Sequence, residues 1–191
     1  MATAVDNEEA LLSAAATLLE EGSSFATLSV QSITERAGLG RTNFYFSFRD
    51  KRALLTRLAE DAAAELFEQA EGWFDGEGDG GEELARIVGP VVRLWLRHGP
   101  VLSAVVQTSS LDAEVRDLWR DIAGRFVDAT CRRIEREQAA GRATGVLPRE
   151  TATALVWMTE RTCYQHVQQG GDPERLASAL TRIWQRSLYA T

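Results

Sequence analysis

Apolar residues recur at intervals of three and four along almost the whole chain, and strand-type alternation is nearly absent. This spacing places apolar side chains on one face of an α-helix. Glycine, proline and capping residues interrupt the pattern, most clearly at Gly22, Gly38 and the run Gly76–Gly81. The sequence therefore predicts an all-α fold with about nine helices. We expect these helices at about residues 11–19, 30–37, 41–46, 51–74, 82–98, 100–108, 113–140, 148–168 and 173–189.

The overall composition is that of a globular chain. Of its 191 residues 45% are hydrophobic, enough for a sizeable core. The first ten residues are polar and acidic, and no run of about 18 apolar residues occurs. We therefore expect no secretion signal and no membrane span, and a cytoplasmic location in which Cys131 and Cys163 are free thiols.

Charge is strongly segregated along the chain. The net charge is −7, but the segment from Arg36 to Arg57 carries six basic residues and one acid, Asp50. The segment from Leu58 to Ala85 has ten acids and neither lysine nor arginine. A phosphate backbone responds to the field within a Debye length of about 10 Å. The negative total therefore does not exclude DNA as a partner, although a solvated charged face is the ordinary alternative.

Two short helices joined by a glycine-containing turn are expected between Ser29 and Phe48. This is a helix-turn-helix pattern, in which the second helix enters the major groove. That helix opens with Arg41, Thr42 and Asn43. Arginine pairs with guanine and asparagine with adenine, whereas threonine reaches phosphate. The three phenylalanines of this segment, Phe44, Phe46 and Phe48, are expected mostly in the core.

The stretch from Ala37 to Leu54, which includes Phe44-Tyr45-Phe46-Ser47-Phe48 and Lys51, resembles the signature of TetR-type repressors. The resemblance implies a three-helix DNA-binding head and a larger helical body that dimerises and binds an inducer. It implies head residues 1–50 and body residues 51–191. The positions that it assigns to DNA contact, to phosphate or to bases, are Ser29, Gly40, Arg41, Thr42, Asn43, Tyr45 and Lys51. Two positions depart from the family pattern: Gly40 stands where serine is frequent, and Arg52 stands where an acid is usual, which should strengthen non-specific DNA affinity.

Parts of the C-terminal half also resemble one branch of this family, the mycobacterial ethionamide-resistance repressors. The similar segments are Leu118-Trp119, Ala154–Thr162 and Ile183-Trp184. That branch has a long, mainly apolar tunnel in each subunit. Its polar ligand anchors include asparagines, and Val156 and Thr159 stand at those places here. The tunnel is therefore expected with a different ligand preference.

All five tryptophans lie outside the expected head. Aromatic residues with a few polar groups commonly line small-molecule sites, although each of them alone is more often simply core. The residues predicted to line an apolar pocket are Trp95, Gln107, Trp119, Phe126, Thr130, Thr159 and Trp184. The last two helices are apolar on more than one face, with Leu180 among the apolar residues of the second. They are expected to form a homodimer interface.

An enzyme is the rival interpretation. The only histidines are His98 and His166, and neither has a metal-ligand spacing. No phosphate-binding loop and no catalytic residue is legible, so we predict no metal, no cofactor and no catalysis. The sequence thus predicts a repressor that binds a palindromic double-stranded DNA operator as a dimer and is released by a small apolar effector. The alternatives that stay open are an all-α enzyme acting on an apolar substrate, and a DNA-binding protein without ligand control.

Overall fold

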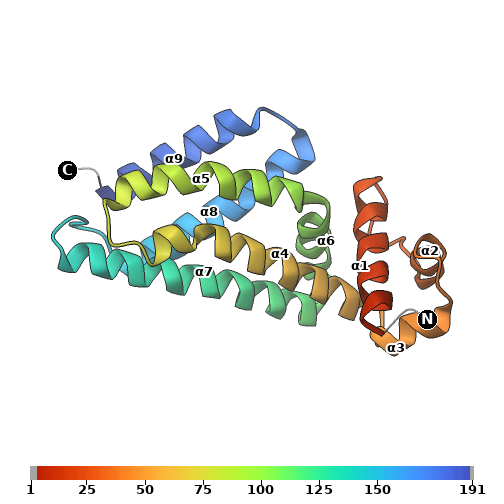
Figure 1. Cartoon of the computed structure of the whole chain (residues 1–191). Coiled ribbons are helices and arrows are strands. Elements are labelled where there is room, and N and C mark those ends of the chain that lie inside the picture. Colours follow the sequence, from red (N-terminus) through yellow and green to blue (C-terminus); the bar gives the residue numbers. More distant parts are fainter. Residues whose placement is uncertain (1–3, 190–191) are drawn as a thin grey trace. The chain divides into compact units, whose positions relative to one another are not determined.

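The computed structural model describes residues 4–189, which form nine α-helices and no strand (Figure 1). This confirms the predicted all-α fold class. The helices are α1 (Ala4–Glu20), α2 (Val30–Arg36), α3 (Arg41–Ser47), α4 (Lys51–Phe74), α5 (Gly80–Arg97), α6 (Gly99–Ser109), α7 (Ala113–Ala139), α8 (Pro148–Gln169) and α9 (Pro173–Tyr189). None of these helices combines the length and apolar content needed to cross a membrane.

Polar side chains cap several helices at their first turn. The Ser29 hydroxyl accepts a hydrogen bond from the backbone N–H of Ser32 at 3.0 Å and begins α2. Asp50 accepts the Ala53 N–H at 2.8 Å before α4, and this bond holds the pKa of its carboxyl below the ordinary value. Asp79 caps α5 in the same way, so that helix begins at Gly80, two residues earlier than the sequence predicted.

The chain divides into two compact units. The first runs to Ala62 and includes Pro100–Trp119, and the second comprises Ala63–Gly99 and the residues from Arg120 onward. Helix α4 contributes residues to both units. This grouping differs from the predicted head (1–50) and body (51–191), and that functional boundary stays a prediction.

In the first unit, α1, α2 and α3 pack against one another (Figure 1). Their contact is built on Leu11, Ile33 and Phe44, whose side chains are inaccessible to solvent. Leu54 and Leu55 of α4 are equally buried. Burial of a side chain of this size stabilises the fold by about 1.5–3 kcal/mol. The three-helix arrangement around α3 therefore rests on a small, complete apolar core.

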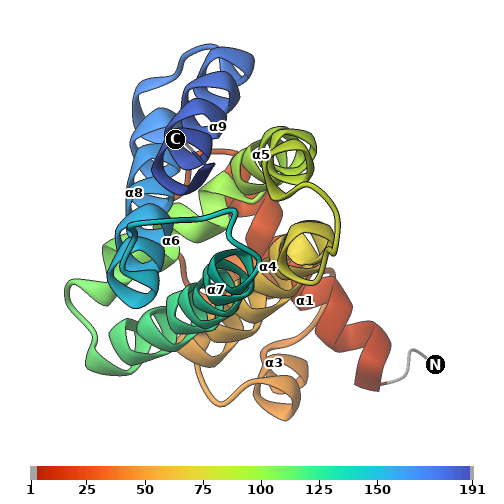
Figure 2. The same ribbon diagram turned by 90° about the vertical axis from the view of Figure 1, so that its left-hand side faces the viewer.

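In the second unit, α9 packs along α5 and also contacts α8 (Figure 2). The α9 residues that face this core are Ala177, Leu180, Trp184 and Leu188, all buried. Leu180 is only 1% exposed, because it packs inside its own subunit. The expectation that Leu180 lies on an intersubunit face is therefore wrong.

A buried arginine fixes the loop between α4 and α5 in the second unit. Arg133 of α7 is fully buried and forms ion pairs with Glu83 at 2.9 Å and Glu137 at 2.8 Å. It also donates to the carbonyls of Trp73 and Gly76 at the end of α4. A buried charge is tolerated only when it is paired and hydrogen-bonded. Both terminal nitrogens of Arg133 meet this need, whereas its Nε has no partner among the described residues.

Candidate functional site

The turn between α2 and α3 depends on glycine. Gly38 has φ +67°, and the next N–H, of Leu39, donates back to the Thr34 carbonyl at 2.9 Å. This left-handed glycine ends α2 and turns the chain by the shortest route into α3. Gly40 is the N-cap of α3 and provides no side-chain hydrogen bond. A Cβ at Gly40 would meet only the Asn43 Oδ1, at 3.6 Å, so the serine frequent in the family would fit.

Helix α3 presents one face to the core and the other to solvent. Phe44 is 0% exposed and Phe48 is 6% exposed, and the two rings pack against each other with centroids 5.8 Å apart. Arg41, Thr42 and Tyr45 are exposed, and Asn43 is half-buried. The predicted base- and phosphate-contacting residues of α3 thus lie at its start and on its open side.

Phe46 is 85% exposed, so the expectation that it is a core residue is wrong. It lies two residues after buried Phe44 and two before buried Phe48, and a helix of 3.6 residues per turn cannot bury all three. An exposed ring beside Tyr45 on the open face of α3 is a feature that the sequence reading missed. The 100° helical step between neighbouring residues was the signal that could have identified it.

Most of the basic residues from Arg36 to Arg57 are engaged within the protein. Arg36 pairs with Glu21, Arg57 with Glu8 and Asp61, and Arg52 with Asp112 and Glu114. Arg49, which is 73% exposed on its side chain, lies 3.3 Å from Asp50 and 3.6 Å from Glu114. Of the five arginines in this segment, Arg41 alone has no acidic partner in the described part of the chain. The field expected from this segment is therefore partly neutralised, and Arg52 is held by acids.

Lys51 has three backbone acceptors. Its ammonium donates to the carbonyls of Phe25 at 2.8 Å, Ala26 at 3.2 Å and Leu28 at 2.6 Å. Partial burial lowers the pKa of this group from its ordinary value. An ammonium has three hydrogens, and all three are used here. The contact to DNA phosphate expected of Lys51 stays a prediction, and the visible role is to hold the segment before α2 against the start of α4.

Ser29 is exposed at the start of α2. Its hydroxyl and backbone N–H form a reciprocal pair with Ser32, with Ser29 N donating to Ser32 Oγ at 3.1 Å. A phosphate bound there would meet the free N–H groups of the first helical turn as well as the hydroxyl. Its predicted phosphate contact is compatible with this position.

The predicted ligand-binding residues are distributed over both units. Trp95, Phe126, Thr130, Thr159 and Trp184 belong to the second unit, whereas Gln107 and Trp119 belong to the first. Gln107 is exposed, a position that does not favour a role in lining an enclosed cavity. A single pocket lined by all seven residues stays a prediction.

Two threonines of the second unit differ in the state of their hydroxyls. Thr159 donates to the Leu155 carbonyl at 2.8 Å and accepts from the indole N–H of Trp184 at 2.9 Å. Thr130 is 0% exposed, and within the described residues its Oγ1 has no hydrogen-bond partner. A buried unpaired hydroxyl costs about 1–3 kcal/mol. Of these two buried or half-buried hydroxyls, the one without a partner is therefore that of Thr130.

Aromatic rings form a continuous series through the second unit. Phe67 contacts Phe126 edge-on at 5.3 Å and Phe74 at 5.0 Å, and Trp73 contacts Trp184 edge-on at 5.7 Å. Phe67 was missed by the sequence reading, although it lies seven residues before Phe74 on the same helical face. The Trp73 and Phe74 rings, 5.8 Å apart, join these contacts into one series, so the core of this unit is rich in aromatic rings.

The thiol of Cys163 and the carboxyl of Glu160, both on α8, are buried. Burial, and then the neighbouring Glu160 charge, raises the pKa of Cys163 to about 12. The thiol is therefore protonated at neutral pH and is a poor nucleophile. Cys131 and Cys163 are both free, as predicted.

The outer faces of α8 and α9 remain partly apolar. Ile183 of α9 is 43% exposed, and Leu176, seven residues earlier, is half-buried. On α8, Trp157 and Tyr164 lie seven residues apart and are also half-buried, with Arg161 stacked over the Tyr164 ring at 5.2 Å. A helix with apolar residues beyond its core face has room for a second partner.

Sequence comparison relates this arrangement to known regulators. Residues 11–58 match the family described as bacterial regulatory proteins of the tetR family, and residues 84–190 match the C-terminal domain of the transcriptional regulator EthR. The HTH-type transcriptional regulator EthR of Mycobacterium tuberculosis is 32% identical over 193 residues, covering 96% of this chain and 88% of the relative. Its counterpart in Mycolicibacterium smegmatis is 29% identical over 195 residues, covering 97% and 88%. These relatives are transcriptional regulators, not enzymes.

The fold is shared with solved structures at lower sequence identity. A protein of Syntrophomonas wolfei, described as a TetR-family transcriptional regulator, superposes with a TM-score of 0.81. It is 17% identical, and the match covers 96% of this chain and 95% of that one. The likeness concerns the fold, including the three-helix group that holds α3.

Proposed function

This chain belongs to the TetR family of transcriptional regulators, and we propose that it is a repressor that binds a palindromic DNA operator as a homodimer and is released by an apolar small molecule. Its site of action is then the cytoplasm, where bacterial DNA lies. The three parts of this proposal rest on different observations.

The observation that carries the DNA-binding part is the open face of α3. Arg41 stands at the first position of that helix, exposed and without an acidic partner in the described residues. A recognition helix reads base edges with its N-terminal residues, and a free guanidinium pairs bidentately with guanine. Thr42, Asn43, Tyr45 and Ser29 would supply the remaining base and phosphate contacts.

The dimer part rests on the outer faces of α8 and α9. We assign the intersubunit contact to the half-buried and exposed apolar residues there, chiefly Trp157, Tyr164 and Ile183. Two recognition helices related by a twofold axis fit half-sites about 34–36 Å apart or a multiple of it. A palindromic operator is the DNA counterpart of that symmetry.

The ligand part rests on the core of the second unit. The unpaired Thr130 hydroxyl lies in a core rich in aromatic rings. Val156 and the occupied hydroxyl of Thr159 offer few polar anchors on α8. We therefore assign the effector to mainly apolar molecules with one hydrogen-bonding group. A DNA-binding protein without ligand control is the remaining alternative.

Selection of binding sites from a random duplex library tests the DNA and dimer parts together. The full-length protein should enrich a palindromic sequence with two half-sites, and its affinity should fall by roughly 10-fold or more when one half-site is scrambled. Enrichment of a single, asymmetric site would contradict the dimeric assignment. Absence of any enrichment would contradict operator binding itself.

A further inference from the structure

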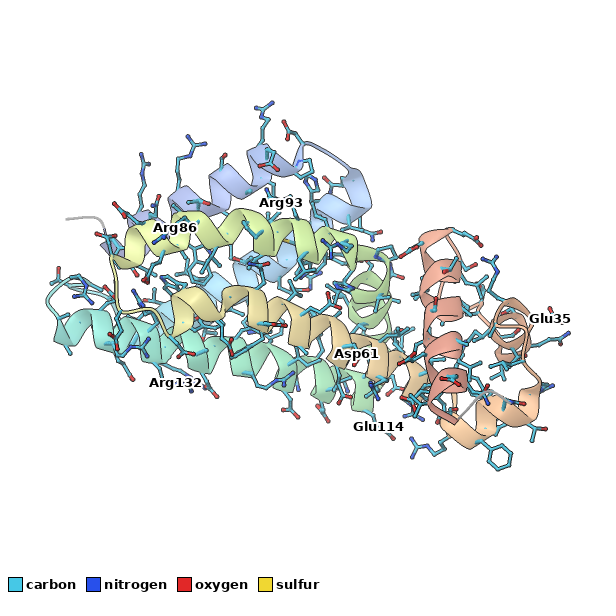
Figure 3. All side chains as sticks on the ribbon, viewed as in Figure 1. Glu35, Asp61, Arg86, Arg93, Glu114 and Arg132 are labelled. Carbon is cyan, nitrogen blue, oxygen red and sulfur yellow. The ribbon has the colours of Figure 1, made fainter. Side chains whose placement is uncertain are left out.

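A groove of about 660 Å³ runs between α5 and α9 on the surface of the second unit. Figure 3 shows two of its arginines, Arg86 and Arg93, along α5. The lining residues that bear on its chemistry are Arg86, Pro90 and Arg93 of α5 and Glu174, Ser178 and Arg182 of α9. Its volume lies within the range of about 300–1,000 Å³ typical of small-molecule sites. The aromatic core proposed above for the apolar effector contributes no residue to it.

The charge of this groove is opposite to that of the chain. Arg86, Arg93 and Arg182 oppose the single carboxylate of Glu174, which leaves two positive charges in a protein whose net charge is −7. Arginine is suited to phosphate, because its planar guanidinium donates two parallel hydrogen bonds to phosphate oxygens. A local excess of two positive charges matches one phosphate dianion.

Two of these arginines are free for a ligand. In the described part of the chain neither Arg86 nor Arg182 has an acidic partner, and Arg86 makes only a 3.3 Å bond from Nε to the Glu82 carbonyl. Arg93 is held in place by Glu174 at 2.9 Å. Its guanidinium lies over Gly89, where a Cβ would be 3.4 Å from Nη1.

Other groups in the groove suit the organic part of a ligand. Pro90 lies inside α5 and has no N–H, so the Arg86 carbonyl lacks its usual partner within the helix. Ser178 adds an exposed hydroxyl. A neighbouring groove of about 470 Å³ shares Pro90 and Arg93, but there Glu65 and Glu68 balance the charges of Arg93 and Arg97. Of these two grooves, the α5–α9 groove is the one that combines free arginines with a positive balance.

We propose that the groove between α5 and α9 binds a small organic phosphate, with Arg86 and Arg182 as the free cationic contacts. Glu174 competes with the ligand for Arg93. This site is separate from DNA binding and from the apolar effector site.

Calorimetric titration of the full-length protein at low salt tests the site, with ADP and inorganic pyrophosphate as probes and adenosine as the uncharged control. The double variant R86Q/R182Q should bind both phosphates roughly 3- to 30-fold more weakly than the wild type, as expected for the loss of two solvent-exposed charge pairs. The matched control R125Q/R132Q, which removes two exposed arginines of α7 (Figure 3 labels Arg132), should bind within about twofold of the wild type. E174Q should bind more tightly, a gain that misfolding cannot produce.

Equal weakening in both double variants would overturn the proposal, because it would assign binding to the general field. So would unchanged affinity in R86Q/R182Q, or weaker binding by E174Q. Vesicles that contain phosphatidic acid serve as a further probe in the same titration. Binding to these vesicles without binding to ADP or pyrophosphate would overturn the assignment to a soluble ligand. Sedimentation that shows R86Q/R182Q as a monomer while R125Q/R132Q stays dimeric would identify the groove as a contact between copies, which also overturns it.

Discussion

Arg41 differs from the other basic residues near it because the folded chain leaves its charge unpaired. Arg36, Arg52 and Arg57 are matched to acids that lie far away in sequence, such as Glu8 and Asp112. The linear charge pattern predicted a basic DNA-binding segment, but it could not show this pairing. At the residue scale, specificity therefore concentrates at the start of α3.

Replacing Arg41 by alanine should weaken binding to the selected operator by about 1–3 kcal/mol, since a bidentate contact to a base is lost. Non-specific duplex should lose much less affinity, so the preference at one base step should become blurred. Fluorescence anisotropy with labelled duplexes measures both, with Arg132→Ala on α7 as the control. Unaltered operator selection by Arg41→Ala would remove Arg41 from the DNA contact.

Lys51 offers a test of structural against DNA-contacting roles. Lys51→Met keeps the aliphatic stem but leaves three carbonyls without their donor. We expect the free energy of unfolding to fall by about 1–3 kcal/mol. Loss of one phosphate contact would change the slope of log affinity against log salt concentration by roughly 0.9. We expect a smaller change for Lys51→Met, because the backbone carbonyls already occupy the ammonium group. Chemical denaturation measures the change in stability, and salt titration of duplex binding measures the change in slope. A slope change of roughly 0.9 without loss of stability would instead assign Lys51 to a phosphate contact.

The unpaired hydroxyl of Thr130 makes an unusual prediction. Thr130→Val removes a buried polar group and keeps the shape of the side chain, so the ligand-free protein should gain about 1 kcal/mol or more in stability. The same change should weaken an effector that bonds to the hydroxyl by roughly 5- to 10-fold. Thermal unfolding and ligand titration measure both. A destabilised variant would show that the hydroxyl is satisfied in solution.

At the scale of helices, the sequence predicted existence and order well because capping groups mark the ends. Ser29, Asp50, Pro148 and Pro173 begin helices where expected. The start of α5 was harder, since Asp79 caps a helix that begins inside a glycine run. The side toward which a residue points was harder to predict than the bounds of its helix. Phe46 is exposed and Leu180 is buried inside its own subunit, contrary to expectation. Periodicity alone does not say which neighbour covers each face.

The dimer prediction belongs to α9. Ile183→Glu places a charge on the exposed apolar face of that helix and should produce monomers, because an unpaired carboxylate cannot be buried at an interface without a large cost. The isolated subunit should keep its helical circular dichroism. Arg182→Glu, also on exposed α9 surface but on the groove side, is the control and should remain dimeric. A dimeric Ile183→Glu by sedimentation would place the interface elsewhere.

At the scale of the whole molecule, two long helices, α4 and α7, contribute residues to both compact units. A stiff helix can convert a small displacement at one end into a reorientation of what is attached at the other. The far end of α4 is held by Arg133 and by the Trp73–Trp184 contact. The sequence predicted this helix, but not its anchor, because the buried ion pair between Arg133 and Glu83 joins residues 50 positions apart. We infer that a ligand in the aromatic core acts on DNA binding through α4.

Reciprocal linkage between effector and operator is the decisive measurement for ligand-controlled repression. Apolar compounds that bind the protein are identified by tryptophan fluorescence, and each is titrated with and without saturating operator. We expect at least one ligand to weaken operator binding by roughly 5- to 150-fold, a coupling of about 1–3 kcal/mol. Operator DNA should then weaken the binding of that ligand by the same factor. Equal ligand affinity in the presence and absence of operator, for every apolar compound that binds the core, would contradict ligand-controlled repression.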